Sequence, residues 1–140
     1  MTIRAMDHFT IVTDRLDETL AFYASLGLID GPRPDFGIGG AWLYAADRPI
    51  LHIVEVERMP EPRRGALDHM AFTSEGLLGV VQRLSERGTP YRIIRTPSPF
   101  SRWQMFIEDP NGVEVELDFD ISETPPEDWK QTAARMRAPA

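Results

Sequence analysis

Cysteine is absent from this chain of 140 residues. Its absence excludes disulfides, thiolate metal ligands and a cysteine nucleophile together. Basic residues are in the minority, with 15 Lys and Arg against 22 Asp and Glu, which gives a net charge of −7. Nucleic acid and anionic membranes are therefore not expected as partners, because both need a clustered basic surface.

Long apolar segments are missing as well. No stretch approaches the ~20 apolar residues that a membrane-spanning helix requires. The N-terminal residues also lack the apolar core of a secretory signal. We therefore expect a cytoplasmic protein. Its length and composition are typical of a single globular domain over residues 1–140, with enough apolar side chains for a real core.

One stretch of the sequence occurs twice. Residues 6–13, MDHFTIVT, return as residues 67–74, LDHMAFTS. Both copies are apolar and β-branched, which is typical of a strand. Each carries a histidine at the same place, His8 in the first copy and His69 in the second. An internal repeat of this kind defines the architecture of the chain, and it predicts that both halves contribute a histidine to one site.

The predicted elements follow the same order in both halves: a strand, a helix that ends at a glycine, and three further strands. The halves, about 4–58 and about 66–120, are thus predicted to be two tandem βαβββ modules of an α+β fold. In the first half, residues 28–40 are expected to be a loop with at most a short strand. The other expected strands are 6–13, 41–46, 50–57, 66–74, 91–95, 103–108 and 113–119, and the helices are 15–26 and 75–87.

Residues 121–140 form a tail after the second module. Thr124 and Glu127 fit a capping box, and Pro125 suits the first position of a helix. We therefore expect a short C-terminal helix from Pro125 to about Arg137.

The last strands of the two halves can also be aligned. The sequence Leu51-His52-Ile53 matches Val115-Glu116-Leu117, so that His52 is equivalent to Glu116. If the first and last strands of each half lie side by side, these two residues and the two repeated histidines, His8 and His69, can converge on one point. All 3 histidines of the chain then occupy repeat-equivalent positions, which favours a metal site over isolated structural histidines.

Neutral imidazole and carboxylate groups are the ligands that zinc, nickel, manganese and ferrous iron prefer. His8, His69 and Glu116 are the three expected ligands. Three roles remain open for His52: a fourth ligand, an acid or base beside the metal, or a residue that lines the pocket.

Several other side chains are candidates for contacts with a substrate. Arg92, Arg95 and Arg102 are each either a group that recognises an anionic substrate or a surface residue. Four large apolar residues either wall a pocket beside the metal or pack in the core. They are Trp42, Tyr44, Trp103 and Met105.

Over roughly residues 4–120 the sequence resembles the vicinal oxygen chelate superfamily, which includes glyoxalase I, extradiol dioxygenases and bleomycin-resistance proteins. The resemblance rests on the two Asp-His pairs, on residues 106–112 (FIEDPNG) and on residues 115–117 (VEL). It implies two βαβββ modules whose curled mixed sheet surrounds a metal cup. It also implies one divalent metal ion (Zn, Ni, Co, Mn or Fe(II)) bound by His8, His69 and Glu116.

The resemblance further implies an enzyme, most simply a glyoxalase-like lyase or isomerase. Its small substrate would chelate the metal through two vicinal oxygens, and Glu116 or His52 would move a proton. Glyoxalase I has a glutamate at the place of His52, so its own reaction is not implied. The alternatives are an Fe(II) extradiol-type ring-cleaving dioxygenase and a metal-free binding protein of the bleomycin-resistance kind. Members of this size commonly form homodimers, which we expect here too.

Overall fold

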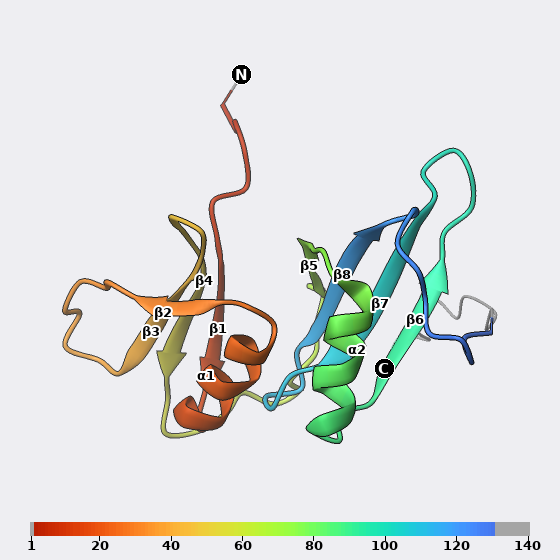
Figure 1. Cartoon of the computed structure of the whole chain (residues 1–140). Coiled ribbons are helices and arrows are strands. Elements are labelled where there is room, and N and C mark those ends of the chain that lie inside the picture. Colours follow the sequence, from red (N-terminus) through yellow and green to blue (C-terminus); the bar gives the residue numbers. More distant parts are fainter. Residues whose placement is uncertain (1, 131–140) are drawn as a thin grey trace. The chain divides into compact units, whose positions relative to one another are not determined.

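The computed structural model describes residues 2–130. The chain divides into two compact units, Met1–Arg63 and Arg64–Ala140. Each unit contains one module with the element order βαβββ (Figure 1). The tandem modules predicted from the repeat are thus confirmed. Among the described residues, the helices are too short and too polar to cross a membrane.

The first unit forms an open four-stranded sheet in the order β1-β4-β3-β2. Strand β1 runs parallel to β4, and the other neighbours are antiparallel. The first and last strands of the module therefore lie side by side, which is the condition under which the sequence brings His8 close to His52. Its elements are β1 (Phe9–Thr13), α1 (Leu16–Ser25), β2 (Ile29–Gly31), β3 (Gly40–Ala45) and β4 (Arg48–Glu55).

The second unit repeats this topology. Its sheet has the order β5-β8-β7-β6, again with the first and last strands of the module parallel. Helix α2 lies over one face of the sheet (Figure 1). The elements are β5 (Met70–Thr73), α2 (Leu77–Glu86), β6 (Tyr91–Arg95), β7 (Arg102–Glu108) and β8 (Glu114–Asp120).

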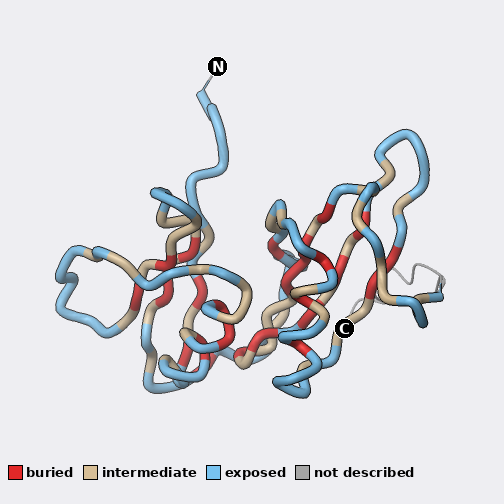
Figure 2. The backbone as a smooth tube through the Cα atoms, in the orientation of Figure 1, coloured by how far each residue is buried: buried red, intermediate tan, exposed pale blue. Residues whose placement is uncertain are grey.

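Each sheet has one face that belongs to the core. Alternate residues of β7 are buried and apolar, and the residues between them are more exposed (Figure 2). The same alternation places Val115, Leu117 and Phe119 of β8 in the core. Because successive side chains of a strand point to opposite faces, Gln104, Phe106 and Glu116 all lie on the other face.

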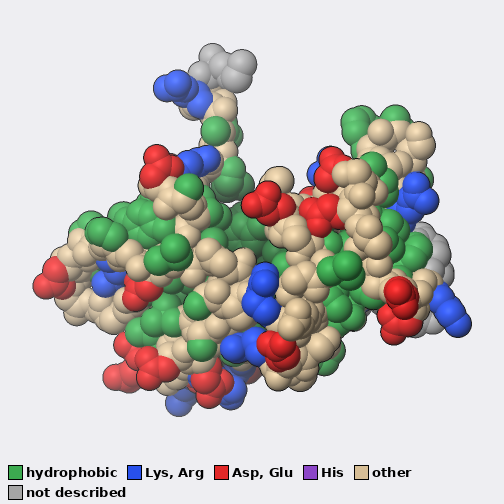
Figure 3. Space-filling model, viewed as in Figure 1, with side chains coloured by type: hydrophobic (Ala, Val, Ile, Leu, Met, Phe, Trp, Pro, Cys, Tyr) green, Lys and Arg blue, Asp and Glu red, His purple; other side chains and the backbone are tan. Residues whose placement is uncertain are grey.

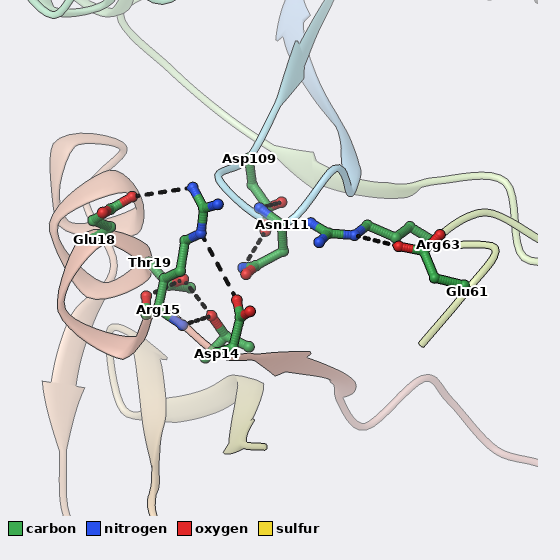
Figure 4. Close-up of polar contacts among 9 residues, drawn as sticks. Asp14, Arg15, Glu18, Thr19, Glu61, Arg63, Asp109 and Asn111 are labelled. Atoms are coloured by element: carbon green, nitrogen blue, oxygen red, sulfur yellow. Dashed lines mark hydrogen bonds and ion pairs between the residues drawn. The ribbon is translucent and has the colours of Figure 1, made fainter. Parts of the chain in front are cut away.

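The start of α1 is held by buried hydroxyl groups rather than by a charged cap. The Thr19 hydroxyl donates to the carbonyl of Arg15 at 2.8 Å and lies 3.0 Å from the Thr13 hydroxyl, which accepts the backbone N–H of Arg15. Figure 4 shows this arrangement, together with the surface ion pairs of Arg15 to Asp14 and Glu18. Exposed pairs of this kind add little stability, whereas the two fully buried hydroxyls would be costly to leave unpaired.

The turn between β7 and β8 is built by the buried side chain of Asp109. Its Oδ1 accepts the backbone N–H groups of Asn111 at 2.8 Å and Val113 at 2.9 Å. Gly112 has a φ of 83°, a left-handed conformation that glycine adopts without strain. This turn joins the two strands that the sequence predicted at 103–108 and 113–119. Part of the sequence signature of the family therefore serves the turn itself.

Within the described residues, the tail does not form the helix expected from Pro125. Residues 121–130 contain only turns, and the remainder of the expected helix lies outside the described residues. Helical geometry at Pro125 is disfavoured because another proline follows it. Glu123, just before, instead accepts the backbone N–H groups of Gly76 and Leu77 and so caps α2.

Charged side chains are mixed on the face of the molecule that Figure 3 displays. Lys and Arg side chains of the described residues are interspersed with Asp and Glu there and form no continuous basic patch. This agrees with the excess of acidic residues in the composition.

Candidate metal site

The first unit brings together two of the predicted site residues, the expected ligand His8 and His52. His8 immediately precedes β1, and His52 lies within β4. Their rings are stacked, with centroids 3.7 Å apart and an angle of 17° between the planes. On its other side, His52 stacks on Trp42 of β3 at 4.1 Å and 9°. The pairing of strands causes this, because Trp42 lies directly opposite His52 in the antiparallel register.

Burial and charge keep the His52 ring neutral. Its pKa is lowered, first by burial and then by the nearby His8 ring. Its Nε2 atom is buried and has no hydrogen-bond partner among residues 2–130. His8 differs, because its Nδ1 lies 2.6 Å from a carboxylate oxygen of Asp7. A neutral imidazole with an unused nitrogen suits either metal ligation or acceptance of a proton.

The second unit brings together the other two predicted ligands. His69 immediately precedes β5, and its Nε2 lies 2.9 Å from Oε2 of Glu116 on β8. The other ring nitrogen, Nδ1, lies 2.7 Å from a carboxylate oxygen of Asp68. Gln104 of β7 donates a hydrogen bond to the second oxygen of Glu116, Oε1. The Glu116 carboxylate is thus held from both sides.

Glu116 is a buried carboxylate with an altered pKa. Burial, followed by the neighbouring carboxyl group of Asp118, raises its pKa to about 7. The hydrogen bond with Asp68 raises the pKa of His69. Glu116 and His69 therefore share protons near neutral pH, and a bound cation would take the place of those protons.

Two further acidic side chains, those of Asp68 and Glu114, lie beside His69. Asp68, His69 and Glu114 each offer a ligand atom, and these atoms lie within 4.8 Å of one another. The sequence did not predict the roles of Asp68 or Gln104. For Asp68 a signal was present, because both repeated histidines follow an aspartate, and a carboxylate on one ring nitrogen orients the other toward a metal. No comparable signal marked Gln104.

The four predicted pocket residues divide between the two faces of their sheets. Trp42 lies on the face of His52, and the Tyr44 hydroxyl donates to the carbonyl of Pro32 at 2.6 Å. Trp103 and Met105 lie on the core face of β7, opposite to that of Glu116, and are 6% and 0% exposed. They pack the core rather than a pocket beside Glu116.

The position of Phe106 explains this difference. Trp42 pairs with His52, whereas Phe106 pairs with Glu116. Phe106 is therefore the structural equivalent of Trp42. The second half contains an odd number of extra residues ahead of β7. An odd shift along a strand reverses the face on which a side chain lies, and Trp103 therefore lies on the other face of the sheet.

The side chains present fit a divalent metal. Each unit pairs a histidine that precedes its first strand with a ligand-type side chain on its last strand, and the donors are imidazole nitrogens and carboxylate oxygens. The unpartnered Nε2 of His52 is the kind of buried polar atom that a ligand explains. That His8, His69 and Glu116 bind one metal ion, with His52 as a fourth ligand or beside them, remains a prediction.

Comparison with known proteins defines the family. Residues 5–117 match the model of the Glyoxalase/Bleomycin resistance protein/Dioxygenase superfamily. Because the match covers most of the chain, this protein belongs to that superfamily, which confirms the resemblance inferred from the sequence. None of the functionally curated proteins matches the sequence significantly.

Solved structures share the fold. A Bacillus anthracis protein provisionally assigned to the glyoxalase family has a TM-score of 0.68 at 22% identity and covers 86% of this chain and 98% of its own. A glyoxalase family protein from Enterococcus faecalis has a TM-score of 0.62 at 24% identity, with coverages of 84% and 99%. A glyoxylase/bleomycin resistance protein/dioxygenase domain from Frankia sp. has a TM-score of 0.68 at 18% identity, with coverages of 85% and 99%. At these identities the likeness concerns the fold alone.

Proposed function

We propose that this protein is a divalent-metal-dependent enzyme, a glyoxalase-like lyase or isomerase whose small substrate chelates the metal through two vicinal oxygens. His8, His69 and Glu116 hold the metal ion. The observation that carries the proposal is the pairing of ligand-type side chains in each unit, the His8–His52 stack in one and the His69–Glu116 contact in the other. Family membership supports it, because the superfamily includes many enzymes.

A bound divalent metal would polarise the two substrate oxygens and stabilise the negative charge that forms when a proton leaves carbon. The chain supplies the base. His52 suits this role because its ring is neutral and its Nε2 is unpartnered within the described residues. Trp42, stacked on His52, fixes the plane of the imidazole and excludes water from one side. Glu116 is the other candidate, since its pKa lies near neutral pH in the metal-free protein.

The metal content of the purified protein tests this proposal. We expect one metal ion per chain, lost in His8→Ala, His69→Ala and Glu116→Gln and retained in the control Glu108→Gln. Glu108 is an exposed carboxylate of β7 that pairs with Arg64 at 2.8 Å. Loss of the metal in variants of both units would mean that both contribute to one site. A protein that holds no metal and takes none up on titration would overturn the proposal and favour a metal-free binding protein.

A second variant distinguishes the two possible roles of His52, as a base and as a metal ligand. If His52 is the base, His52→Gln retains the metal and loses proton exchange at the substrate carbon. If His52 is a ligand, the same variant lowers the affinity for the metal. Isothermal titration with Zn²⁺ or Ni²⁺ distinguishes the two roles without an assay of activity.

A second candidate function uses the same side chains. Two histidines and one carboxylate form the ligand set of non-haem ferrous oxygenases. His52, whose Nε2 has no hydrogen-bond partner among residues 2–130, would be the additional histidine near the oxygen. We infer that this function applies only if the anaerobically purified protein contains iron. Consumption of dioxygen with catechols would then identify a ring-cleaving dioxygenase, whereas zinc, nickel, cobalt or manganese would favour the lyase or isomerase.

A further inference from the structure

A row of residues crosses the second sheet next to Glu116. In the register of the strands, Glu116 of β8 pairs with Phe106 of β7, and Phe106 pairs with Arg92 of β6. Residues directly opposite each other on antiparallel strands point to the same face. Arg92, Phe106 and Glu116 therefore lie on one face of the sheet, with Arg92 two strands, or about 10 Å, from Glu116.

The Arg92 guanidinium is held in place by an aromatic ring. Its Cζ lies 4.2 Å from the centroid of the Phe106 ring, and the edge-on contact of Phe106 with His69 has a centroid distance of 6.2 Å. A cation over the face of an aromatic ring is attracted to it and loses little freedom on binding a further group. Phe106 thus links the guanidinium to the candidate metal site.

The two arginines on this face differ in their partners. Arg102 lies 3.4 Å from a carboxylate oxygen of Asp118. Arg92 makes no hydrogen bond or ion pair with any residue in the part of the chain that the structure describes. Arg95, by contrast, lies over Trp103, on the core side of the sheet. Of the three arginines considered from the sequence, only Arg92 combines the face of Glu116 with a guanidinium that lacks an anionic partner there.

We propose that Arg92 binds a carboxylate of the substrate. The substrate would be a small organic anion whose carboxylate lies at the end away from the vicinal oxygens. This inference rests on the proposed metal-dependent function. The planar fork of a guanidinium matches a carboxylate through two parallel hydrogen bonds. A carboxylate fits better than a doubly charged phosphate, because Arg92 is a single cation on a face that also carries Glu114, Glu116 and Asp118.

The separation of the groups sets the size of this substrate. Its oxygens would lie at His69 and Glu116, and its carboxylate at the Arg92 guanidinium, which is held over the Phe106 ring. Two strand spacings correspond to a molecule about as long as a benzene ring with a substituent at each end. Benzohydroxamate, which chelates metals through two neighbouring oxygens, and its 4-carboxy derivative are therefore suitable probes that differ only by the carboxylate.

The test is calorimetric titration of both probes into the zinc-loaded full-length protein. We expect the 4-carboxy derivative to bind at least about 10-fold tighter than benzohydroxamate, as a charge-assisted contact allows. Arg92→Gln should abolish this difference, and its uptake of zinc shows that the variant is folded. The matched control Arg102→Gln should retain the difference.

The possible failures are distinguishable. If benzohydroxamate binds and the 4-carboxy derivative binds no tighter, or if its advantage survives Arg92→Gln, the assignment of Arg92 is overturned and the metal site stands. If neither probe binds and no zinc is taken up, the proposed function fails and the inference fails with it.

Discussion

Gln104 donates a hydrogen bond from its side-chain amide to Oε1 of Glu116. The other oxygen of that carboxylate, Oε2, remains directed at His69. The two oxygens are thus distinguished before any metal binds. Such outer contacts orient a carboxylate ligand and reduce the cost of ordering it when the metal arrives.

The first prediction concerns this contact. Gln104→Leu keeps the approximate size of the side chain but removes the donor, so Glu116 should become less well oriented. We expect the affinity for Zn²⁺ to fall by about 10- to 100-fold in isothermal titration. Gln82→Leu is the control, because Gln82 lies on the exposed surface of α2 and hydrogen-bonds there to Glu86. Equal affinities in both variants would mean that Gln104 has no part in metal binding.

The second prediction concerns the pH dependence of stability in the metal-free protein. Burial raises the pKa of Glu116 from 4.5 to about 7, so the folded state keeps a proton that the unfolded chain loses. The folded state then binds more protons than the unfolded state, and the free energy of unfolding falls as the pH rises through that window. The raised pKa of His69 acts in the same direction, and its contribution is lost as the pH rises above 6.5.

Urea denaturation in the presence of a chelator measures this effect. Between about pH 5 and 8, the unfolding free energy of Glu116→Gln should fall by about 1 to 3 kcal/mol less than that of the unsubstituted protein. A decline as steep as that of the unsubstituted protein would show that Glu116 does not hold the proton.

The third prediction concerns the buried hydroxyl pair at the start of α1. Thr13→Val has the same shape but leaves the Arg15 N–H without its acceptor. The loss of this hydrogen bond together with the buried contact between the Thr13 and Thr19 hydroxyls should cost about 1 to 3 kcal/mol. Urea denaturation should show that loss, and Thr10→Val on the exposed side of the same strand should change stability by less than about 0.5 kcal/mol. Equal effects of the two variants would contradict a role for the hydroxyl.

The fourth prediction concerns the tail. Glu123 receives the first backbone N–H groups of α2, the N–H of Leu77 at 2.7 Å and that of Gly76 at 3.2 Å. Glu123→Ala should therefore reduce the unfolding free energy by about 0.5 to 2 kcal/mol, in the range of a lost helix cap. Glu127→Ala, an exposed change in the same tail, should be neutral in the same measurement. Equal stability of the two variants would contradict a capping role for Glu123.

The order of the elements was predictable because the repeat and the alternation of apolar residues are strong local signals. The pairing of β1 with β4 and of β5 with β8 was only a condition in the sequence argument, and the structure supplies it. The face occupied by Trp103 was not predictable, because it depends on how many extra residues precede β7, and a shift of one residue reverses the face. The Gln104–Glu116 contact lies beyond the reach of sequence patterns for the same reason, since it depends on the register between β7 and β8.

The tail after residue 120 shows a second reason why a prediction from the sequence can be wrong. Thr124 and Glu127 carry the local signature of a helix start, but in the structure Glu123 binds the N-terminus of α2, and the Trp129 indole donates to the carbonyl of Ile93 at 3.0 Å. Contacts with residues distant in the sequence thus override the local preference.

The stack of Trp42 on His52 makes the indole an optical reporter of that imidazole. At 4.1 Å between ring centroids, the fluorescence of Trp42 is sensitive to the charge of His52, because a protonated imidazole quenches an adjacent indole. Trp103 and Trp129 pack edge to face against each other in the second unit and provide a separate background signal. Proton or metal binding at His52 is therefore readable from the intrinsic emission of the unlabelled protein.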